Sequence, residues 1–384
     1  MEVYLDNAAT TKCCSEASEI VTKTMLIDYG NPSSMHRKGV EAENYVKDAA
    51  KQIAQTMKVK PNEIYFTSGG TESNNWAIIG TAMANRRRGN HIITTAVEHP
   101  AVLAPVKFLE EQGFEVTRLG VNKQGVIDLA ELAEAIRPET ILVSIIYVNN
   151  EIGSVQPISE IGNLLAQSNE DIYFHVDAIQ GYGKYHMFPK KMKIDLLSAS
   201  GHKINGPKGV GFLYVDSRVK INPLIHGGGQ QNNLRSGTDN VPGISGMGVA
   251  AEQAYQELES KREYLYSLKE HMVEGLAKLE DVEIHGMDVA EGAPHIISAS
   301  FDGVRSEVIL HSLEEKGIYV SAGSACATHK RTKSPTLLAI EATNEAMEST
   351  IRFSFSTATK REDIDYTLAT VAELLPMLRR YTRR

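Results

Sequence analysis

Ser198-Ala199-Ser200-Gly201-His202-Lys203 is followed by the turn Asn205-Gly206-Pro207-Lys208-Gly209 and the apolar run Val210 to Val215. Lys203 stands among small and hydroxylic residues between two apolar stretches, where a solvated charge is poorly placed. Burial would lower the pKa of its amine from the usual value of about 10.4 and leave free amine at neutral pH. A free amine condenses with an aldehyde, which in proteins is most often pyridoxal 5′-phosphate (PLP). The competing interpretation is an ordinary surface lysine.

Short β-branched runs alternate with longer helical patterns around this stretch, which is typical of a mostly parallel sheet covered by helices. The expected strands are Glu63 to Thr67, His91 to Thr95, Glu115 to Leu119, Ile141 to Val148, Ile172 to Val176, Leu196 to Ala199 and Gly211 to Val215. The expected helices are Glu41 to Met57, Glu72 to Arg87, Ala101 to Gln112, Asp128 to Ala135 and Ile158 to Gln167.

The later part of the chain predicts a second, smaller unit. Asn222 to Gly248 is rich in glycine and asparagine and is expected to form a long ordered loop, and one helix over Val249 to Leu279 would then connect the two parts. Polar Ala325 to Pro335 is expected to be mobile. The strands of the second part are expected at Val282 to His285, Ile296 to Phe301, Tyr319 to Ser321 and Ile351 to Ser356.

Composition narrows the class of protein. The 384 residues are 42% apolar and 23% charged with a net charge of −8, which is typical of a soluble globular protein and argues against direct nucleic-acid binding. We see no secretory signal and no membrane span, and three cysteines support no disulfide framework, so a cytoplasmic location is expected. The basic runs at Arg86 to Arg88 and at the C-terminus are interpreted as solvated charge, with docking to an acidic partner as the alternative.

Two motifs are suited to hold a phosphorylated ring. In Phe66-Thr67-Ser68-Gly69-Gly70-Thr71-Glu72-Ser73, a strand, two glycines and a helix start place free N–H groups and a hydroxyl where a phosphate would bind, although a simple capped helix has the same pattern. Asp177 and Gln180 follow an apolar strand, at the edge where parallel sheets bind ligands. A carboxylate there keeps a pyridine nitrogen protonated, and an N-cap aspartate is the open alternative.

Three further residues follow or occupy predicted strands. His99, after the strand that ends at Thr95, could stack on a ring or move protons, or be purely structural. Asn150 follows another strand and falls at the same edge. Arg352 lies inside an apolar strand, so a carboxylate partner is expected, from the protein or from a substrate.

A candidate nucleophilic cysteine, Cys326, lies in the motif Ser321-Ala322-Gly323-Ser324-Ala325-Cys326-Ala327. Small residues precede Cys326 and a polar stretch follows it, which suits an exposed thiol that travels as a nucleophile, and a buried structural cysteine is the open alternative. Cys13 and Cys14 are adjacent and are interpreted as structural, because vicinal pairs form strained disulfides.

Taken together and in this order, these signals resemble the cysteine desulfurases of the IscS/NifS type, in the class-V aminotransferase family of fold-type I PLP enzymes. The resemblance runs from Tyr4 to Arg352 and rests also on Tyr4-Leu5-Asp6-Asn7-Ala8-Ala9-Thr10-Thr11, Gly30-Asn31-Pro32-Ser33-Ser34, Asn149-Asn150-Glu151-Ile152-Gly153, His226-Gly227-Gly228-Gly229-Gln230 and Arg235-Ser236-Gly237-Thr238. It implies a mostly parallel seven-stranded sheet flanked by helices in a large PLP-binding domain at 13–255. A smaller α+β domain would comprise 1–12 and 256–384.

The resemblance also implies a role for each site residue. Lys203 would bind PLP covalently, Asp177 would pair with the pyridine nitrogen, and His99 would stack on the ring. Gln180 would bond the ring hydroxyl, while Asn150 and Arg352 would hold the substrate carboxylate. The phosphate would be held by Gly70, Thr71, Ser200 and His202, and in the neighbouring subunit by Thr238. No metal is implied.

The implied reaction removes sulfur from L-cysteine and leaves L-alanine and a persulfide on Cys326. The short motif before Cys326 and the longer loop after it are similar to the first group of the family, which serves protein acceptors. The implied partners are therefore a second copy, with shared active sites, and a sulfur acceptor such as an Fe–S scaffold or a tRNA-thiolation enzyme.

The sequence departs from the family pattern at two places, and other activities are possible for this fold. Gln231-Asn232-Asn233 replaces the usual Glu-Arg-Gly, which affects the dimer-facing loop, and the basic run His329 to Lys333 leads to the hypothesis of an acidic acceptor. Selenocysteine lyase and aminotransferase activities are the enzymatic alternatives, and Cys326 disfavours transamination, which needs no second nucleophile. A scaffold that only binds partners is disfavoured by the presence of both Lys203 and Cys326.

Overall fold

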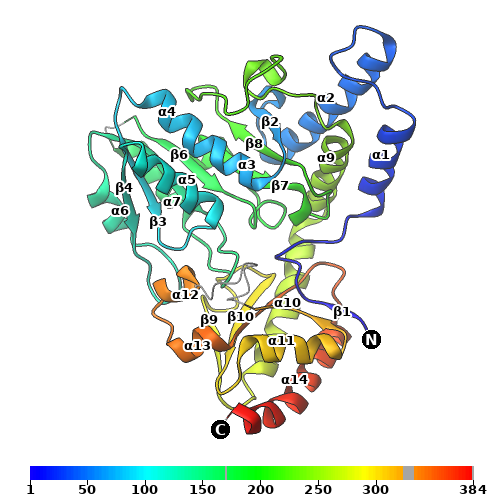
Figure 1. Ribbon diagram of the computed structural model, residues 1–384, viewed down its shortest axis with the longest axis vertical. Coiled ribbons are helices and arrows are strands. Elements are labelled where there is room, and N and C mark those ends of the chain that lie inside the picture. The colour runs from blue at the N-terminus through cyan, green and yellow to red at the C-terminus, as the bar shows by residue number, and fades with distance from the viewer. Residues whose placement is uncertain (169–170, 323–332, 383–384) are drawn as a thin grey trace.

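The computed structural model describes residues 1–168, 171–322 and 333–382. Within these ranges, a seven-stranded sheet and a four-stranded sheet lie in different parts of the molecule, here called the large sheet and the small sheet (Figure 1). The large sheet has the spatial order β2 (Ile64–Thr67), β8 (Gly211–Val215), β7 (Leu196–Ser200), β6 (Tyr173–Asp177), β5 (Thr140–Ile146), β3 (His91–Thr95) and β4 (Glu115–Leu119).

Strand β8 runs antiparallel to both of its neighbours, and the other neighbouring strands of the large sheet run parallel. All seven strands lie close to the ranges expected from the sequence. The predicted fold class, a mostly parallel sheet flanked by helices, is confirmed.

Successive side chains of a strand point to opposite faces of a sheet, and helices cover both faces of the large sheet. Phe212 and Tyr214 of β8 join one apolar cluster, and Leu213 joins another. The first cluster is closed by α1 (Ser15–Leu26), α2 (Arg37–Met57), α6 (Leu129–Ala135), α7 (Ile158–Gln167) and α9 (Val241–Tyr255). The second is closed by a π-helical segment (Trp76–Gly80), α4 (Thr81–Asn85) and α5 (Pro100–Glu111).

The helix expected over Glu72 to Arg87 is less regular than predicted. It consists of α3 (Gly70–Asn75), the π-helical segment and α4, and it ends at Asn85. Such wider turns interrupt α-helices locally and leave no signal in apolar periodicity. The indole N–H of Trp76 in this segment donates to the carbonyl of Asn222 at 2.9 Å.

The expectation of a loop up to Gly248 is wrong from Val241 onward, where α9 begins behind an Asn240 cap. Its glycines serve helix packing rather than chain flexibility. A Cβ on Gly246 would lie 2.7 Å from the side chain of Val21 in α1. A Cβ on Gly248 would meet the Cα of Ala49 in α2 at 2.7 Å, so glycine permits this close approach.

The single helix expected over Val249 to Leu279 is also wrong. The helix is interrupted between α9 and α10 (Leu258–Leu276), where Glu257 adopts a left-handed φ of 50°. Residues with side chains rarely adopt this conformation, so the sequence pattern did not predict the break.

The small sheet has the order β12 (Ser321–Ala322), β13 (Thr350–Ser354), β10 (Ile296–Phe301) and β9 (Val282–His285), with antiparallel neighbours. A separate parallel pair joins β1 (Val3–Tyr4) to β11 (Ile318–Tyr319), so the strand expected at Tyr319 to Ser321 is divided between β11 and β12. The remaining helices are α8 (Pro189–Met192), α11 (Ser306–Glu315), α12 (Pro335–Ala339), α13 (Asn344–Ser349) and α14 (Arg361–Thr382).

The N-terminal segment links the two sheets. The backbone N–H of Leu5 donates to Tyr319, and that of Asn7 donates to Ser354. A few residues later, Thr11 N–H donates to the carbonyl of His202, just after β7. The chain from Leu5 to Thr11 therefore lies between the small sheet and the residues before Lys203.

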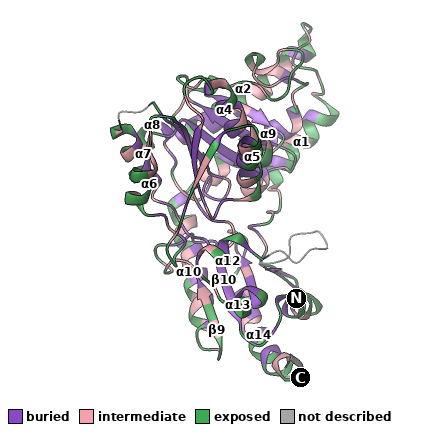
Figure 2. Ribbon diagram, turned by 60° about the vertical axis from the view of Figure 1, so that its left-hand side comes forward, coloured by how far each residue is buried: buried purple, intermediate pink, exposed green. Residues whose placement is uncertain are grey.

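The burial of residues follows the arrangement of the sheets inside and the helices outside. Inner strands of the large sheet are buried along their whole length, and helices expose their outer faces (Figure 2). Among the described residues, no helix combines the length and apolar character required to cross a bilayer.

Candidate active site

A cavity of about 600 Å³ lies where the large sheet faces the small one, and it is here called the main cavity. Asp177 and Ser200, the last residues of β6 and β7, border it from the large sheet. Arg352 of β13 and Ser298 of β10 border it from the small sheet. The carboxyl ends of parallel strands are the usual place of ligand sites in such sheets.

Most residues predicted for the site border this cavity. They are Gly70, Thr71, His99, Asn150, Asp177, Gln180, Ser200, His202, Lys203 and Arg352. Thr238 is not one of the lining residues and is exposed in the segment before α9. Cys326 lies outside the described residues, while Cys13 and Cys14 are free thiols.

Lys203 ends a short 3-10 turn (Gly201–Lys203) that follows β7. Its Nζ donates to the carbonyl of Ala9 at 2.7 Å and also to the carbonyl of Ala8. Burial, with the nearby positive charge of Arg352, lowers the pKa of Lys203 to about 8. The free amine is therefore far more populated near neutral pH than in an exposed lysine.

Asp177 is 2% exposed and is held by two hydrogen bonds. Its Oδ2 accepts from the side-chain amide of Asn74 at 2.7 Å, and its Oδ1 accepts from the N–H of Ile179 at 3.0 Å. Burial raises the pKa of Asp177, and the neighbouring His99 opposes this rise. Two donors and a nearby imidazole thus hold a buried carboxylate at the edge of the sheet.

His99 caps the start of α5. Its Nδ1 accepts from the backbone N–H of Ala101 at 3.1 Å, so the neutral ring carries its proton on Nε2. Burial lowers the pKa of His99, which favours this neutral form, while Asp177 opposes the shift. The ring therefore borders the cavity with a defined tautomer.

Gln180 connects the main cavity to residues behind it. Its Nε2 donates to the carbonyl of Ala8 at 2.9 Å, and its Oε1 lies 3.3 Å from Nε2 of His295. The second amide hydrogen of Gln180 takes part in no hydrogen bond to the described residues and is available to a ligand.

The start of α3 provides an anion-binding corner. Gly69 turns the chain with a φ of 150°, and a Cβ on Gly70 would lie 2.2 Å from Cδ1 of Ile179. A side chain at position 70 therefore has no room. The first N–H groups of a helix have no partner within it, and with Thr71 and Ser200 they suit a phosphate.

Of the two carboxylate partners left open by the sequence, a protein acid or a substrate, the structure shows the protein acid. Its Nη2 pairs with Asp6 at 2.9 Å, and its Nη1 donates to the carbonyl of Asn150 at 2.8 Å. Its buried Nε has no hydrogen-bond partner among the described residues. The fixed guanidinium thus presents an unused donor beside the cavity.

Ala322 and Lys333, the described residues on either side of 323–332, border the main cavity. Ser334 donates a 2.5 Å hydrogen bond to Oε2 of Glu151. The side-chain amide of Asn149 contacts Oγ1 of Thr336 at 3.2 Å. Residues after β5 therefore hold the chain at Ser334 and Thr336.

Several of these supporting residues were missed in the sequence analysis. Asn74 and Asp6 act across long sequence distances. Asp6 lies in a quoted motif, and Asn74 directly follows one. Glu98 is 3% exposed, and its Oε1 accepts from Thr95 and from the N–H of Ile146. Burial raises the pKa of Glu98 to about 8, so it is neutral at pH 7.

These groups match PLP in chemistry: an amine for the aldehyde, a carboxylate for the pyridine nitrogen, and N–H and hydroxyl groups for the phosphate. No cluster of three or more histidine, cysteine or acidic side chains that could hold a metal is found in the part of the chain that the structure describes. The fold and the donor set define a PLP-dependent enzyme with a mostly parallel sheet.

The chain belongs to the aminotransferase class-V family, whose model matches residues 3–367, and within it to the cysteine desulfurases of the IscS/NifS type. A cysteine desulfurase IscS of Methanosarcina thermophila is 45% identical over 98% of this chain and 93% of its own. One from Dictyoglomus turgidum is 44% identical over 98% and 95%. These findings confirm the resemblance.

Solved structures of similar proteins have the same fold as this chain. A NifS-like protein superposes with a TM-score of 0.93 at 37% identity, over 98% of this chain and all of its own. SspA in complex with cysteine superposes with a TM-score of 0.82 at 36% identity, over 93% of this chain and all of its own. Enzymes of this family depend on PLP.

Proposed function

We propose that this chain is a cysteine desulfurase that converts L-cysteine to L-alanine and stores the sulfur as a persulfide on Cys326. The substrate sulfur bonds to the thiol sulfur of Cys326 as its bond to the substrate Cβ breaks. Cβ ends with one more hydrogen, so cysteine and a thiol become alanine and a persulfide without an external oxidant. The observation that supports this proposal is the buried amine of Lys203 beside Asp177 and His99, in a cavity also bordered by Ala322 and Lys333.

The cofactor-holding roles follow from the geometry of the main cavity. Lys203 would bind PLP through its amine, Asp177 would keep the ring nitrogen protonated, and His99 would face the ring. Gln180 would donate its free amide hydrogen to the ring hydroxyl. The phosphate would be taken by Gly70, Thr71, Ser200 and His202. Bound PLP supplies an electron sink for the carbon that loses its proton.

Lys203 is the residue that moves protons. A pKa of about 8 makes its amine a base near neutral pH, suited to remove the α-proton of the substrate. The Ala8 and Ala9 carbonyls accept from Nζ and so orient it.

Asn150 and Arg352 would hold the substrate carboxylate. The unused Nε of Arg352 and the fixed plane of its guanidinium support this role. A charge-assisted contact also orients the substrate, because the carboxylate is fixed before the proton is removed.

Cys326 would be the sulfur acceptor. Ala322 lies four residues before it and borders the main cavity, and four extended residues reach about 14 Å. We propose that the persulfide then passes to an acceptor protein, such as an Fe–S scaffold or a tRNA-thiolation enzyme, in the cytoplasm.

The assembly would be a homodimer with shared sites. Thr238 is exposed and is not among the residues that line the main cavity of its own chain, which supports a role at the phosphate of the partner subunit. The proposed domains are 13–255 and, together, 1–12 and 256–384. Their support is the separate apolar cluster around the small sheet, which includes Val3 and Leu5.

The test follows alanine and persulfide separately in the PLP-loaded protein. Wild type should release alanine from L-cysteine and gain one sulfur on Cys326 by mass spectrometry. Cys326→Ser should retain PLP and the spectral response to L-cysteine but form no persulfide, and Lys203→Ala should release no alanine. Sulfide release by Cys326→Ser at the wild-type rate would show that the assignment of Cys326 is wrong.

A further inference from the structure

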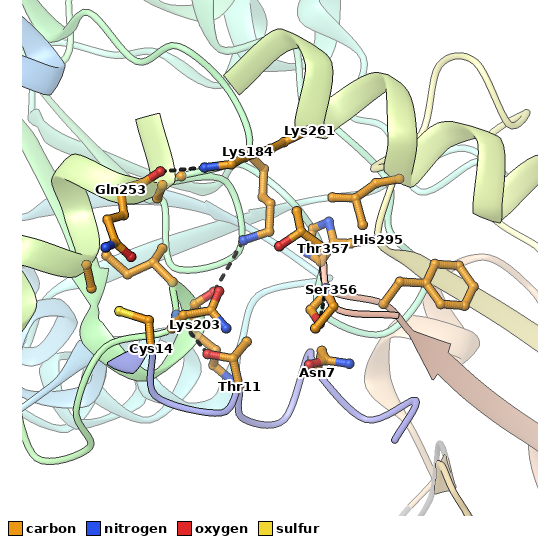
Figure 3. A pocket seen from close by; sticks show the side chains of 18 of the residues that line it. Asn7, Thr11, Cys14, Lys184, Lys203, Gln253, Lys261, His295, Ser356 and Thr357 are labelled. Atoms are coloured by element: carbon orange, nitrogen blue, oxygen red, sulfur yellow. Dashed lines mark hydrogen bonds between the residues drawn. The ribbon is translucent and has the colours of Figure 1, made fainter. Parts of the chain in front are cut away.

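A second cavity of about 290 Å³, here called the rear cavity, lies behind Lys203 (Figure 3). It is bordered by the N-terminal segment near Thr11, by α9 and α10, and by the chain after β13 at Ser356. Lys203 and Gln180 border both the rear cavity and the main cavity. Nothing in the proposed desulfurase reaction uses this space.

The lining of the rear cavity is positively charged. It includes Lys12, Lys184, Lys203, Lys261 and Arg262 together with His295, and no aspartate or glutamate is among its lining residues, all of which are described. Arg262 is paired with Glu259, and the Lys203 amine is held by Ala8 and Ala9. Lys12, Lys184 and Lys261 carry the remaining positive charge. The amines of Lys184 and Lys261 each donate to one backbone carbonyl, of Lys203 and Gln253 respectively, and to no carboxylate among the described residues (Figure 3).

Lys184 is the central residue. Its Nζ donates to the carbonyl of Lys203 at 3.3 Å, and no ion pair to it is found among the described residues (Figure 3). Burial and the positive charge of Lys261 lower the pKa of Lys184 to about 8. An ammonium enclosed without a carboxylate is unfavourable, so an anion beside it would stabilise the charged form.

His295 provides a second, independent observation. It is 2% exposed, and its Nδ1 has no hydrogen-bond partner among the described residues. Its Nε2 faces Oε1 of Gln180, an acceptor, and therefore carries the proton of the neutral ring. Burial and the positive charges of Lys184 and Lys269 lower the pKa of His295 well below its usual value. A bound anion would oppose this shift and favour uptake of a proton from solvent, which would turn Nδ1 into a donor and satisfy this buried atom.

We propose that the rear cavity binds a small oxyanion between Lys184, Lys261 and His295. The shared chemistry is two or more negatively charged oxygens on a compact molecule, of the sulfate and phosphate type or the dicarboxylate type. The volume of about 290 Å³ equals roughly ten water molecules at about 30 Å³ each, so such an ion fits with a few waters.

The bound ion would act on the main cavity through two hydrogen bonds. Lys184 contacts the backbone carbonyl of Lys203, and His295 contacts Gln180. An ion that keeps both cationic would strengthen both contacts, because hydrogen bonds from charged donors are the stronger ones. The rear cavity is therefore placed to adjust the residues that hold the catalytic amine.

The test uses the PLP-loaded protein, in which the phosphate-binding corner is filled, with excess L-alanine to occupy the Arg352 region. Sodium sulfate and sodium malonate are titrated separately by calorimetry at constant ionic strength. We expect saturable binding of at least one of them, and the ion that binds identifies the oxyanion type. Lys184→Met should weaken it about ten- to a hundredfold, the usual effect of one charge-assisted hydrogen bond.

Lys269→Met is the matched control, because Lys269 is a buried lysine near His295 that donates to the Ala293 carbonyl and does not line the rear cavity. It should not weaken affinity, because Lys269 does not line the cavity and loss of its charge favours protonation of His295. If Lys184→Met does not fold, Lys261→Gln replaces it, since Lys261 is only partly buried. Absence of saturable binding, equal affinity in the lining variants and wild type, or binding that disappears when L-alanine is added would overturn the proposal.

Discussion

Oδ1 of Asp6 lies 2.9 Å from Nη2 of Arg352, a residue 346 positions later in the chain. This ion pair joins the N-terminal segment to β13 at the edge of the main cavity. It also fixes the guanidinium while leaving Nε without a partner among the described residues. Asp6 therefore positions the guanidinium of Arg352, and Arg352 remains available to bind the carboxylate of a substrate.

Arg352→Gln should therefore lower kcat/KM for L-cysteine about ten- to a hundredfold, mainly through KM, because one charged contact to the substrate is lost. Asp6→Asn should raise KM less, since it removes only the positioning contact. Steady-state alanine release measures both constants. A loss confined to kcat in Arg352→Gln would contradict carboxylate binding.

Asn74→Ala should weaken PLP retention and lower kcat about tenfold, because Asp177 loses its 2.7 Å donor and becomes easier to protonate. The adjacent Asn75 provides the control. Its amide donates to the Thr71 carbonyl on the exposed side of the helix, so Asn75→Ala should leave both quantities nearly unchanged. Dialysis against buffer, followed by absorbance, measures retention, and equal losses in the two variants would refute the assigned link.

PLP uptake by the cofactor-free protein should follow the free amine of Lys203. With a pKa of about 8, the uptake rate should rise about tenfold per pH unit below that value and level off above it. Asp6 raises this pKa, so Asp6→Asn should move the midpoint to lower pH. Stopped-flow absorbance gives the profile, and a midpoint near the usual lysine value would be incompatible with the buried amine.

Glu98 should make stability fall with rising pH. Its folded pKa of about 8 lies above the usual glutamate pKa of 4.5, so between these values the folded state holds a proton that the unfolded state releases. The contribution is complete below pH 4.5 and is lost as pH rises through about 8, with a slope up to about 1.4 kcal/mol per pH unit. The Glu98→Gln variant should lack this component of the slope in denaturant unfolding from pH 5 to 8. Equal slopes would mean that Glu98 is ionised in the folded state.

The basic run at 329–331 should govern transfer but not extraction of sulfur. Neutralising His329, Lys330 and Arg331, while retaining Lys333, should leave alanine release with a small thiol reductant unchanged. Transfer to an acidic acceptor should slow several-fold and lose salt dependence. Neutralising Arg86 to Arg88 is the control, and unchanged transfer to all acceptors in the first variant would count against the hypothesis.

The sequence by itself determined the strands and the order of the motifs. Short apolar runs such as His91 to Thr95 and Gly211 to Val215 are local signals, and the structure has strands at those bounds. Asp177 and Asn150 were placed at one edge because parallel strands end together. The glycine-rich start of α9 was misread, because the same glycines that indicate a loop also permit close helix packing.

Only the tertiary structure decided which groups hold the site residues. Asn74 meets Asp177 across 103 positions, and Asp6 meets Arg352 across 346. The rear cavity likewise exists because Lys184, Lys261 and His295 come together from separate elements. Local periodicity carries no information on such contacts, because burial and pKa shifts depend on which distant segments exclude water from a given side chain.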